Sequence, residues 1–293
     1  MTFKLTKSEH QFSIMITLNN HSSGTVISTS KNTVSNGEPK PLKLCSCGRR
    51  QLLQTALLSV AAPSHASDYK TILNTVRPPR PDWYEEFYAS ALNSQMMQSY
   101  EAEISAYKSQ LFANLRGNAK KVLEIGIGTG PNLKYYAGDG DLEIFGVDPN
   151  AKMEKYAEAA AQAAGLPSAN FRFIQSAGEA IPLRDASVDA VVGTLVLCSV
   201  TDVDRTLQEV KRVLRPGGFY LFVEHVAAKD GTFLRYVQNV LDPLQQTVAD
   251  GCHLTRETGK KIDEAGFSHL NLTSIFLSNT AFLNPQVYGI ATK

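Results

Sequence analysis

The fold of this chain is decided by the stretch KVLEIGIGTG at residues 121–130. Its first half, Lys121–Ile125, is short and mostly apolar, which predicts a buried strand. Its second half is a glycine-rich turn, which lets a ligand approach the backbone closely and permits positive φ angles. Pro131 follows and suits the first position of a helix, because that position needs no backbone N–H. The stretch therefore predicts a strand, a ligand-binding turn and a helix in succession.

Two acidic residues flank this turn and distinguish between the nucleotides that it can bind. Glu124 lies two residues before Gly126, and Asp148 ends the next predicted strand, 18 positions beyond Gly130. A carboxylate at that strand end can accept hydrogen bonds from both ribose hydroxyl groups. The dinucleotide pattern G-x-G-x-x-G/A requires glycine or alanine where this chain has Pro131. The pattern therefore favours a positively charged, phosphate-free nucleoside over a nicotinamide dinucleotide.

Strand and helix patterns alternate along the rest of the chain. Helices are predicted at 151–164 and 203–214. This alternation predicts a doubly wound, mostly parallel α/β sheet whose ligands lie beyond the carboxyl ends of its strands. A helix-prone region at 82–115 precedes the sheet, and it is expected either to pack on the core or to form a lid over a substrate pocket. The predicted strands are 121–125, 142–148, 171–174, 188–194, 219–224, 270–277 and 286–292.

The N-terminal part has the composition of a targeting segment. Residues 1–44 are rich in Ser and Thr and contain two acidic residues, which is typical of a chloroplast transit peptide. Arg49 and Arg50 precede a short apolar run and resemble a twin-arginine signal for thylakoid transfer; the end of the transit peptide is the alternative. We expect a chloroplast protein, in the stroma or the thylakoid. Its expected parts are a targeting segment at 1–66, a helical region at 67–117 and a nucleotide-binding domain at 118–293.

Composition excludes several other classes of protein. The net charge of +1 argues against nucleic acid as the main partner. No apolar run reaches the roughly 18 to 20 residues that a membrane-spanning helix requires. Cysteines are too few and too scattered for a disulfide scaffold, and the Cys45-x-Cys47 pair lacks a second Cys/His pair at suitable spacing. The sequence therefore predicts no metal site.

From residue 121 onward the chain resembles the class I S-adenosylmethionine-dependent methyltransferases. The segments VLEIGIGTG, IFGVDPN, SVDAVVGTLVLCSV, EVKRVLRPGG and FVEHV carry this resemblance. The segments TLVLCSV, EHVAA, DGCHLTRET and VYGIA resemble the animal membrane-associated alkyl-thiol methyltransferases and their plant relatives. The resemblance implies a Rossmann-like sheet of seven strands in the order 3-2-1-4-5-7-6, with the last strand antiparallel. It also implies S-adenosylmethionine as cofactor and a small lipophilic acceptor, which we expect to be a thiol or a quinone-like ring. The animal group is anchored by an N-terminal hydrophobic helix, whereas this chain has a targeting segment there, so its membrane attachment does not transfer and peripheral membrane contact is the most that we expect.

The same resemblance implies a cofactor site along the strand ends. The glycine turn and its neighbours would surround the methionine half, and the acid after the second strand would hold the ribose. Three residues after the third strand would line the adenine, and a turn after the fourth strand would lie beneath the sulfonium. Many members place an aspartate where Ala177 stands, so adenine contact would depend on backbone groups or on Glu179. The implied residues are Glu124, Gly126, Gly128, Gly130, Asn132, Asp148, Pro149, Ala177, Gly178, Glu179, Leu195, Leu197 and Cys198.

Candidates for the acceptor side follow the fifth strand. His225 and His253 are candidate catalytic bases, with a structural hydrogen bond as the alternative for each. The apolar residues of segment 227–254 predict a wall that faces a lipophilic acceptor. A thiol of pKa about 8.5 needs no strong base, whereas an alcohol or carbon acid does. A nucleophile built from Cys252 and His253 is not expected, because adjacent side chains diverge, and Cys198 is expected to pack beneath the cofactor.

Methyl transfer from S-adenosylmethionine to a small acceptor is the function that this pattern favours. A catalytically silent, cofactor-binding assembly protein is the first alternative, because no base is evident. A nicotinamide-dependent oxidoreductase is the second, and Pro131 disfavours it.

Overall fold

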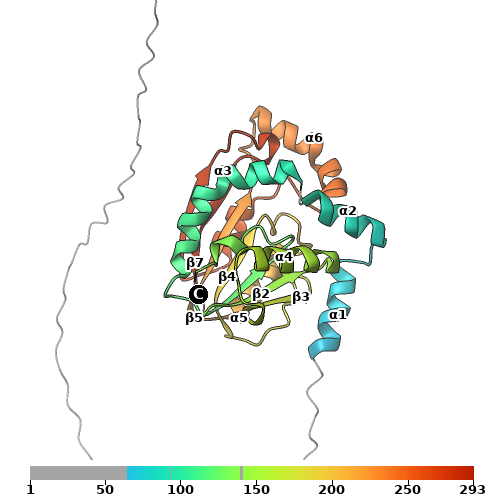
Figure 1. Cartoon of the computed structure of the whole chain (residues 1–293). Coiled ribbons are helices and arrows are strands. Elements are labelled where there is room, and N and C mark those ends of the chain that lie inside the picture. Colours follow the sequence, from blue (N-terminus) through green and yellow to red (C-terminus); the bar gives the residue numbers. More distant parts are fainter. Residues whose placement is uncertain (1–64, 93, 139–140) are drawn as a thin grey trace, which may run out of the picture. The chain divides into compact units, whose positions relative to one another are not determined.

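A seven-stranded sheet forms the centre of the structure (Figure 1). Its strands are β1 (Lys121–Ile125), β2 (Glu143–Asp148), β3 (Phe171–Gln175), β4 (Val188–Thr194), β5 (Leu214–His225), β6 (His269–Ile275) and β7 (Gln286–Thr292). They follow the order β3-β2-β1-β4-β5-β7-β6. The pairs among β1 to β5 are parallel, and β7 is antiparallel to β5 and to β6. The predicted fold class, strand order and antiparallel last strand are confirmed.

The computed structural model describes residues 65–92, 94–138 and 141–293, all of which belong to one compact unit. The predicted transit peptide, the twin-arginine pair and Cys45-x-Cys47 lie outside the described residues and stay predictions. Within the described ranges, no helix combines the length and apolar character needed to cross a bilayer.

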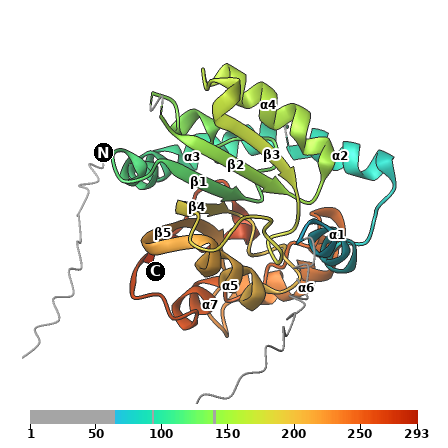
Figure 2. The ribbon, with the colours of Figure 1, turned by 90° about the horizontal axis from the view of Figure 1, so that it is seen from below.

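Helices cover both faces of the sheet (Figure 2). α3 and α4 pack on one face, and α5 and α7 pack on the other. Alternate residues of a strand enter different cores: Val122 packs beneath α3, whereas Leu123 and Ile125 pack beneath α5. The helices are α1 (His65–Val76), α2 (Asp82–Leu92), α3 (Gln95–Phe112), α4 (Glu154–Ala163), α5 (Val203–Val213), α6 (Phe233–Val248) and α7 (Thr258–Glu264).

The boundaries of α5 show how local sequence sets an element. Asp202 caps its first turn by accepting a hydrogen bond from the Arg205 amide at 2.9 Å. Lys211 and Arg212 lie in its last turn, where positive charge stabilises a helix end. The chain then becomes extended at once, because β5 begins at Leu214. β5 therefore begins five residues earlier than the predicted 219.

The helix predicted to begin at Pro131 is not formed. The short 3-10 helix η2 (Leu133–Tyr135) follows the glycine turn instead. Asn132 and Tyr136, on either side of η2, both donate hydrogen bonds to the Glu124 carboxylate. These two bonds hold the chain in a compact turn, so an α-helix does not extend from the glycines.

The helix-prone region 82–115 divides into two helices with different roles. α3 packs on the sheet through buried residues, among them Tyr100 and Ile104. α2 instead crosses the carboxyl edge of the sheet, where the Asn150 side chain donates a hydrogen bond to the Glu85 carbonyl at 3.0 Å. The prediction of packing on the core is confirmed for α3. α2 lies over the edge where ligands are expected, and its role as a lid stays a prediction.

Candidate active site

The three glycines of the turn all have positive φ angles, from 52° to 78°, but they serve different purposes. A Cβ atom at Gly130 would meet the backbone of α4 at 3.2 Å, so this glycine allows close helix packing. A Cβ atom at Gly126 would collide with the Val196 side chain. At Gly128 the nearest atom would be Leu92 Cδ1, at 3.8 Å. Space for a ligand above the backbone is therefore found at Gly128, beneath the end of α2.

Glu124 is buried behind the turn and organises it. Its carboxylate accepts hydrogen bonds from Asn132 Nδ2 at 2.8 Å and from the Tyr136 hydroxyl at 2.6 Å. Burial raises the pKa of Glu124 to about 7, against the lowering effect of these two bonds. The buried Oδ1 atom of Asn132 has no hydrogen-bond partner among the residues that the structure describes. This acceptor-rich corner fits an ammonium group, as the methionine end of the cofactor requires.

Asp148 ends β2 and contacts the same turn. Its Oδ2 atom accepts a hydrogen bond from the Gly128 amide at 3.0 Å, and its Oδ1 atom accepts one from the Asn150 amide at 2.9 Å. Burial raises the pKa of Asp148 to about 6. The Gly128 amide is therefore directed to a carboxylate and not to a phosphate, and no α-helix begins at the turn. Both features oppose a pyrophosphate, which needs free amides at a helix start.

The residues predicted around the adenine form a tightly bonded corner. Ala177 is buried, and a Cβ atom at Gly178 would meet the Thr206 side chain at 3.0 Å. Glu179 accepts hydrogen bonds from the Thr201 amide at 2.7 Å and the Asp202 amide at 3.2 Å. The carboxylate that was expected to contact adenine is thus bonded to the loop before α5.

A cavity of about 230 Å³ opens beside Pro149, at the end of β2. The connection between α1 and α2 closes its other side. A larger hollow of about 450 Å³ includes Lys120, Asp189 and Arg215, which lie at the opposite ends of the strands, so it is remote from this site. The smaller cavity is lined by Leu73, Asn74, Arg77, Pro78, Pro79, Arg80, Asp82, Glu85, Pro149, Asn150, Ala151, Lys152 and Gln175.

The turn after β4, predicted to lie beneath the sulfonium, is fixed from two sides. The amides of Val196 and Leu197 both donate to one oxygen of Glu224, at 3.0 Å each. Arg256 donates to the Leu197 carbonyl at 2.7 Å. Leu195 has a φ of 54°, an unusual conformation for a residue with a side chain. Glu224 and Arg256 therefore both position this turn.

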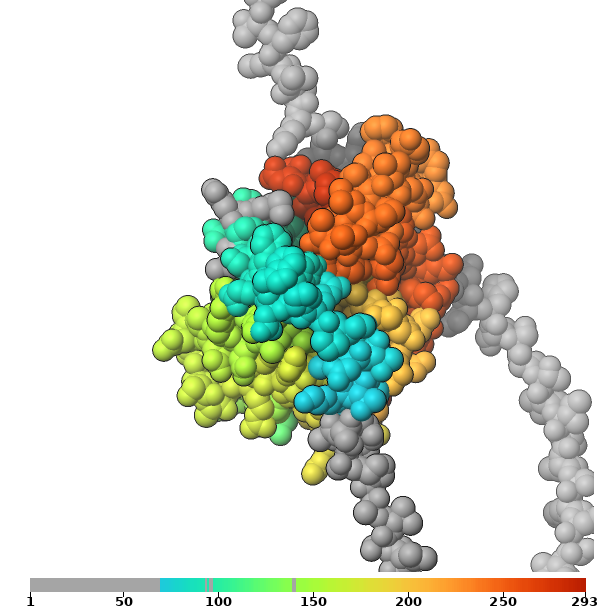
Figure 3. All heavy atoms as spheres, turned by 90° about the vertical axis from the view of Figure 1, so that its right-hand side faces the viewer, coloured from blue at the N-terminus to red at the C-terminus, as the bar shows by residue number. Residues whose placement is uncertain are grey.

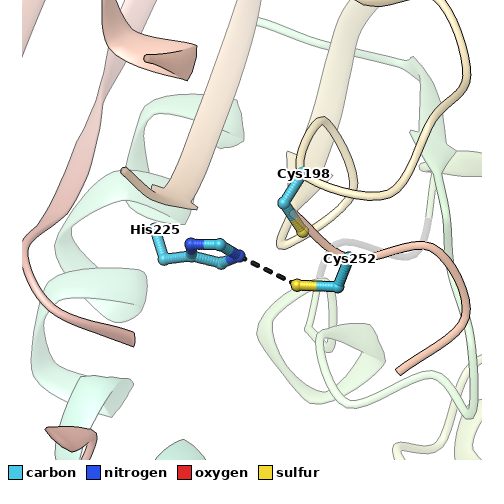
Figure 4. Close-up of side chains that lie close together, drawn as sticks. All are labelled: Cys198, His225 and Cys252. Atoms are coloured by element: carbon cyan, nitrogen blue, oxygen red, sulfur yellow. Dashed lines mark hydrogen bonds between the residues drawn. The ribbon is translucent and has the colours of Figure 1, made fainter. Parts of the chain in front are cut away.

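His225, Cys198 and Cys252 come together at the end of β5 (Figure 4). The distance from His225 Nε2 to Cys252 Sγ is 3.1 Å, and the ligand atoms of all three residues lie within 4.8 Å of one another. The contact with Cys198, together with His225, lowers the pKa of the Cys252 thiol, and the pKa of Cys198 is raised. Cys252 thus has a histidine partner, but this partner is His225 and not the adjacent His253. The sequence predicted no metal site, and the structure brings three potential metal ligands together here.

His253 lies outside this cluster. Its Nδ1 atom is 3.7 Å from Asp242 Oδ2, and its side chain is 33% exposed. Its amide donates to the Cys198 carbonyl at 2.9 Å. Of the two predicted catalytic histidines, the structure therefore places only His225 beside the thiols.

Tyr88, on α2, lies between the two halves of the site. Burial, together with the charges of Asp250, the two thiols and Asp148, raises its pKa well above the ordinary value. Asp250 is itself held by Arg77 at 2.7 Å and by Arg80. The prolines between α1 and α2 indicated a break in the chain, but nothing in the sequence indicated that the arginines among them would reach Asp250.

The wall predicted at 227–254 is formed in part. α6 does lie beside α2, because the Tyr84 hydroxyl donates to the Thr247 carbonyl at 3.4 Å. Its most apolar side chains face outward, however, and Phe233 is 81% exposed. A buried glutamine, Gln238, faces inward and donates to the carbonyls of Phe282 and Asn284. The apolar stripe of α6 is therefore not the lining of the site.

The raised pKa of Glu124 predicts a specific pH dependence of stability. The folded chain binds the Glu124 proton more tightly than the unfolded chain does, so this proton contributes to the free energy of unfolding. The contribution is full below pH 4.5 and is lost as the pH rises toward 7. Between pH 5 and pH 8 we expect wild type to lose about 2 kcal/mol more of its free energy of unfolding than Glu124→Gln does. Urea unfolding at both pH values measures this difference. Glu143→Gln, at the partly exposed start of β2, should behave as wild type, and an equal loss in Glu124→Gln would contradict the assignment.

Comparison with known proteins agrees with this geometry. The model of a methyltransferase domain family matches residues 123–222. Human thiol S-methyltransferase TMT1A is 42% identical over 202 residues, which cover 66% of this chain and 81% of the relative. Rat thiol S-methyltransferase TMT1B is 41% identical over 181 residues, covering 60% and 72%.

Solved structures confirm the fold independently. The partner protein of the Haloferax volcanii Trm112 methyltransferase activator superposes with a TM-score of 0.55 at 17% identity, covering 73% of this chain and 99% of its own. The [4+2]-cyclase SpnF superposes with a TM-score of 0.51 at 18% identity, covering 63% and 79%. The chain is an S-adenosylmethionine-dependent enzyme that methylates a small acceptor, and it belongs to the class I methyltransferases, close to the thiol S-methyltransferases TMT1A and TMT1B.

Proposed function

We propose that this enzyme transfers the methyl group to the sulfur of a small, lipophilic thiol. The observation that carries the proposal is the state of the carboxylates near the acceptor side. Asp250 is held by two arginines, and Glu224 is bonded to two amides of the turn after β4. Asp250 is therefore neutralised by its ion pairs, and Glu224 keeps one buried oxygen, Oε2, without a hydrogen-bond partner among the described residues. A thiol needs no strong base, whereas an alcohol or a carbon acid does. The relationship to thiol S-methyltransferases supports the same acceptor.

S-adenosylmethionine supplies a methyl group on a sulfonium, and the chain's residues hold it in place. Glu124 and Asn132 would accept hydrogen bonds from the ammonium group, and Asp148 would hold the ribose beside Gly128. The turn at Leu195–Cys198 would lie beneath the sulfonium. In-line transfer requires the acceptor sulfur about 3 to 3.5 Å from the methyl carbon, so rigid support for this turn matters.

The acceptor test uses the full chain and labelled S-adenosylmethionine. We expect label in alkyl thiols and aryl thiols, and at least a hundredfold less in matched alcohols, phenols and quinols, because a thiol forms its thiolate near neutral pH and those acceptors hold their protons more tightly. Binding of S-adenosylhomocysteine is measured by calorimetry on the same sample. Binding without transfer to any thiol would contradict the proposal and favour a silent cofactor-binding protein. Transfer to phenols or quinols alone would contradict sulfur as the acceptor atom.

We further propose that the face formed by α2 and α6 contacts a membrane from which the acceptor is taken. Figure 3 shows α2 and α6 side by side, in cyan and orange. Helix α6 exposes an apolar stripe at intervals of three and four residues, and α2 adds Trp83 and Phe87 beside it. Such an exposed apolar stripe suits the interface of a bilayer in which a lipophilic acceptor dissolves. The stripe comprises Phe233, Tyr236, Val240, Leu244 and Val248.

Vesicle sedimentation tests this contact. The wild-type chain should co-sediment with phosphatidylcholine vesicles, and Phe233→Asp/Leu244→Asp should lose at least tenfold in the bound fraction, because the stripe then carries two charges. Phe276→Asp is the matched control, because Phe276 is 70% exposed but lies on neither helix. Equal binding of the stripe variant and wild type would contradict the proposal.

We also propose that the enzyme acts in the chloroplast. The support is the acid-poor, hydroxyl-rich composition of residues 1–44. A fluorescent fusion of the full chain should accumulate in plastids of plant cells, and a fusion that starts at residue 67 should remain in the cytosol. Replacing Arg49 and Arg50 by lysine separates stromal from thylakoid delivery, because only twin-arginine transfer depends on that pair. Plastid entry without residues 1–66 would contradict the proposal.

A further inference from the structure

Three potential metal ligands converge from three separate segments of the chain. Cys198 lies in the turn after β4, His225 ends β5, and Cys252 lies in the loop after α6 (Figure 4). All three are buried, with exposed fractions of 2%, 1% and 7%. Their ligand atoms lie within 4.8 Å of one another. Two sulfurs and one imidazole nitrogen thus surround one point in the protein interior.

This donor set fits zinc. Two cysteines and one histidine leave one of the four tetrahedral positions open, which is the pattern of catalytic zinc sites. In a tetrahedral site with ordinary zinc–sulfur and zinc–nitrogen bonds, neighbouring ligand atoms are about 3.6 to 3.8 Å apart. The observed distance between His225 Nε2 and Cys252 Sγ is 3.1 Å, and no two ligand atoms of the cluster are more than 4.8 Å apart. Small side-chain movements would bring these distances to the tetrahedral values.

The backbone around the cluster holds the ligands independently of their side chains. The His253 amide donates to the Cys198 carbonyl at 2.9 Å, which joins the two cysteine segments. Glu224 and Arg256 fix the turn that carries Cys198, and His225 is paired with Gln286 of β7. Ligands on such rigid supports keep their positions, as a metal site requires.

The imidazole of the cluster has a weak hydrogen-bond partner that a metal would replace. His225 Nε2 faces the Cys252 sulfur at 3.1 Å, and sulfur is a weak hydrogen-bond acceptor. A metal ion bound at Nε2 would leave the imidazole proton on Nδ1, which is buried without a hydrogen-bond partner in the described part of the chain. Two thiolates would neutralise the charge of one Zn²⁺ ion, so the occupied site would carry no net charge.

We propose that Cys198, His225 and Cys252 bind one Zn²⁺ ion, whose fourth position takes the sulfur of the acceptor. The fourth-position part rests on the proposed thiol methylation. The acceptor thiol replaces a zinc-bound water and loses its proton to solvent, becoming a zinc-bound thiolate. A sulfur lone pair then attacks the methyl carbon, and the bond from that carbon to the sulfonium breaks. The products are a neutral thioether, which water displaces from the zinc, and S-adenosylhomocysteine; nothing is oxidised or reduced.

Metal content tests the three-residue site. The full chain carrying Cys45→Ser/Cys47→Ser, which removes the other cysteine pair, is purified under reducing conditions and equilibrated with Zn²⁺. We expect one zinc per chain, and a loss of at least tenfold in zinc affinity for Cys198→Ser, Cys252→Ser and His225→Gln. His269→Gln, at the exposed start of β6, should keep its zinc. Absence of zinc, a Cys198–Cys252 disulfide in its place, or unchanged zinc in the three variants would overturn the site.

Cobalt substitution keeps the test informative if a variant does not fold. The Co²⁺-loaded parent chain should show thiolate-to-cobalt charge-transfer absorption and intense tetrahedral visible bands. Adding an alkyl thiol should shift these bands, whereas the matched alcohol should not. Bands that do not shift when the thiol is added would overturn the fourth-position assignment, but they would not contradict metal binding by the three residues. Full thiol methylation by metal-free protein would overturn the catalytic role of zinc and support the proposed function. Metal binding without any methylation would support the three-residue zinc site and overturn the proposed function.

Discussion

A carboxylate that is removed from water must accept hydrogen bonds, and this requirement shapes the carboxyl edge of the sheet. Glu124 in β1, Asp148 at the end of β2 and Glu224 in β5 are all buried there. Each accepts two hydrogen bonds from the segment that follows its own strand or a neighbouring strand. The loops of the active site are therefore arranged around three buried carboxyl groups that the sheet holds in position. Burial raises the pKa of each carboxyl group, to about 6 for Asp148 and about 7 for the other two.

The same constraint separates this site from a dinucleotide site. Glu124 draws Asn132 and Tyr136 inward, which replaces the expected helix start by a 3-10 turn. Asp148 takes the Gly128 amide. The turn therefore presents oxygen acceptors where a pyrophosphate would need N–H donors. A cationic, phosphate-free nucleoside matches that polarity, which is why strand ends of similar topology serve a different cofactor here.

Sequence patterns predicted the strands because apolar runs and alternating elements are local properties. They predicted Asp148 because its spacing from the glycines is local too. The strand order came from resemblance. The contact between His225 and Cys252 joins residues 27 positions apart in the chain, and it depends on how the loop after α6 returns to the sheet. Glu179 was expected near adenine, but which groups it would bond depended on the backbone of the loop before α5. Contacts of this kind are set by tertiary packing, which no local pattern records.

Helices α2 and α3 are attached to the rest of the structure by different kinds of contact. α3 contributes large side chains such as Tyr100, Ile104 and Phe112 to the core, whereas Ala89 is the buried residue of α2. α2 is otherwise attached by polar contacts, including the bond from Asn150 to the Glu85 carbonyl and the pairing of Arg77 with Glu85. These polar contacts are largely shielded from water, since the side chains of Arg77 and Glu85 are 15% and 14% exposed. Opening α2 would therefore break a polar network, whereas opening α3 would expose the apolar core. α2 thus depends on the polar groups at the carboxyl edge of the sheet, and α3 depends on the core beneath it.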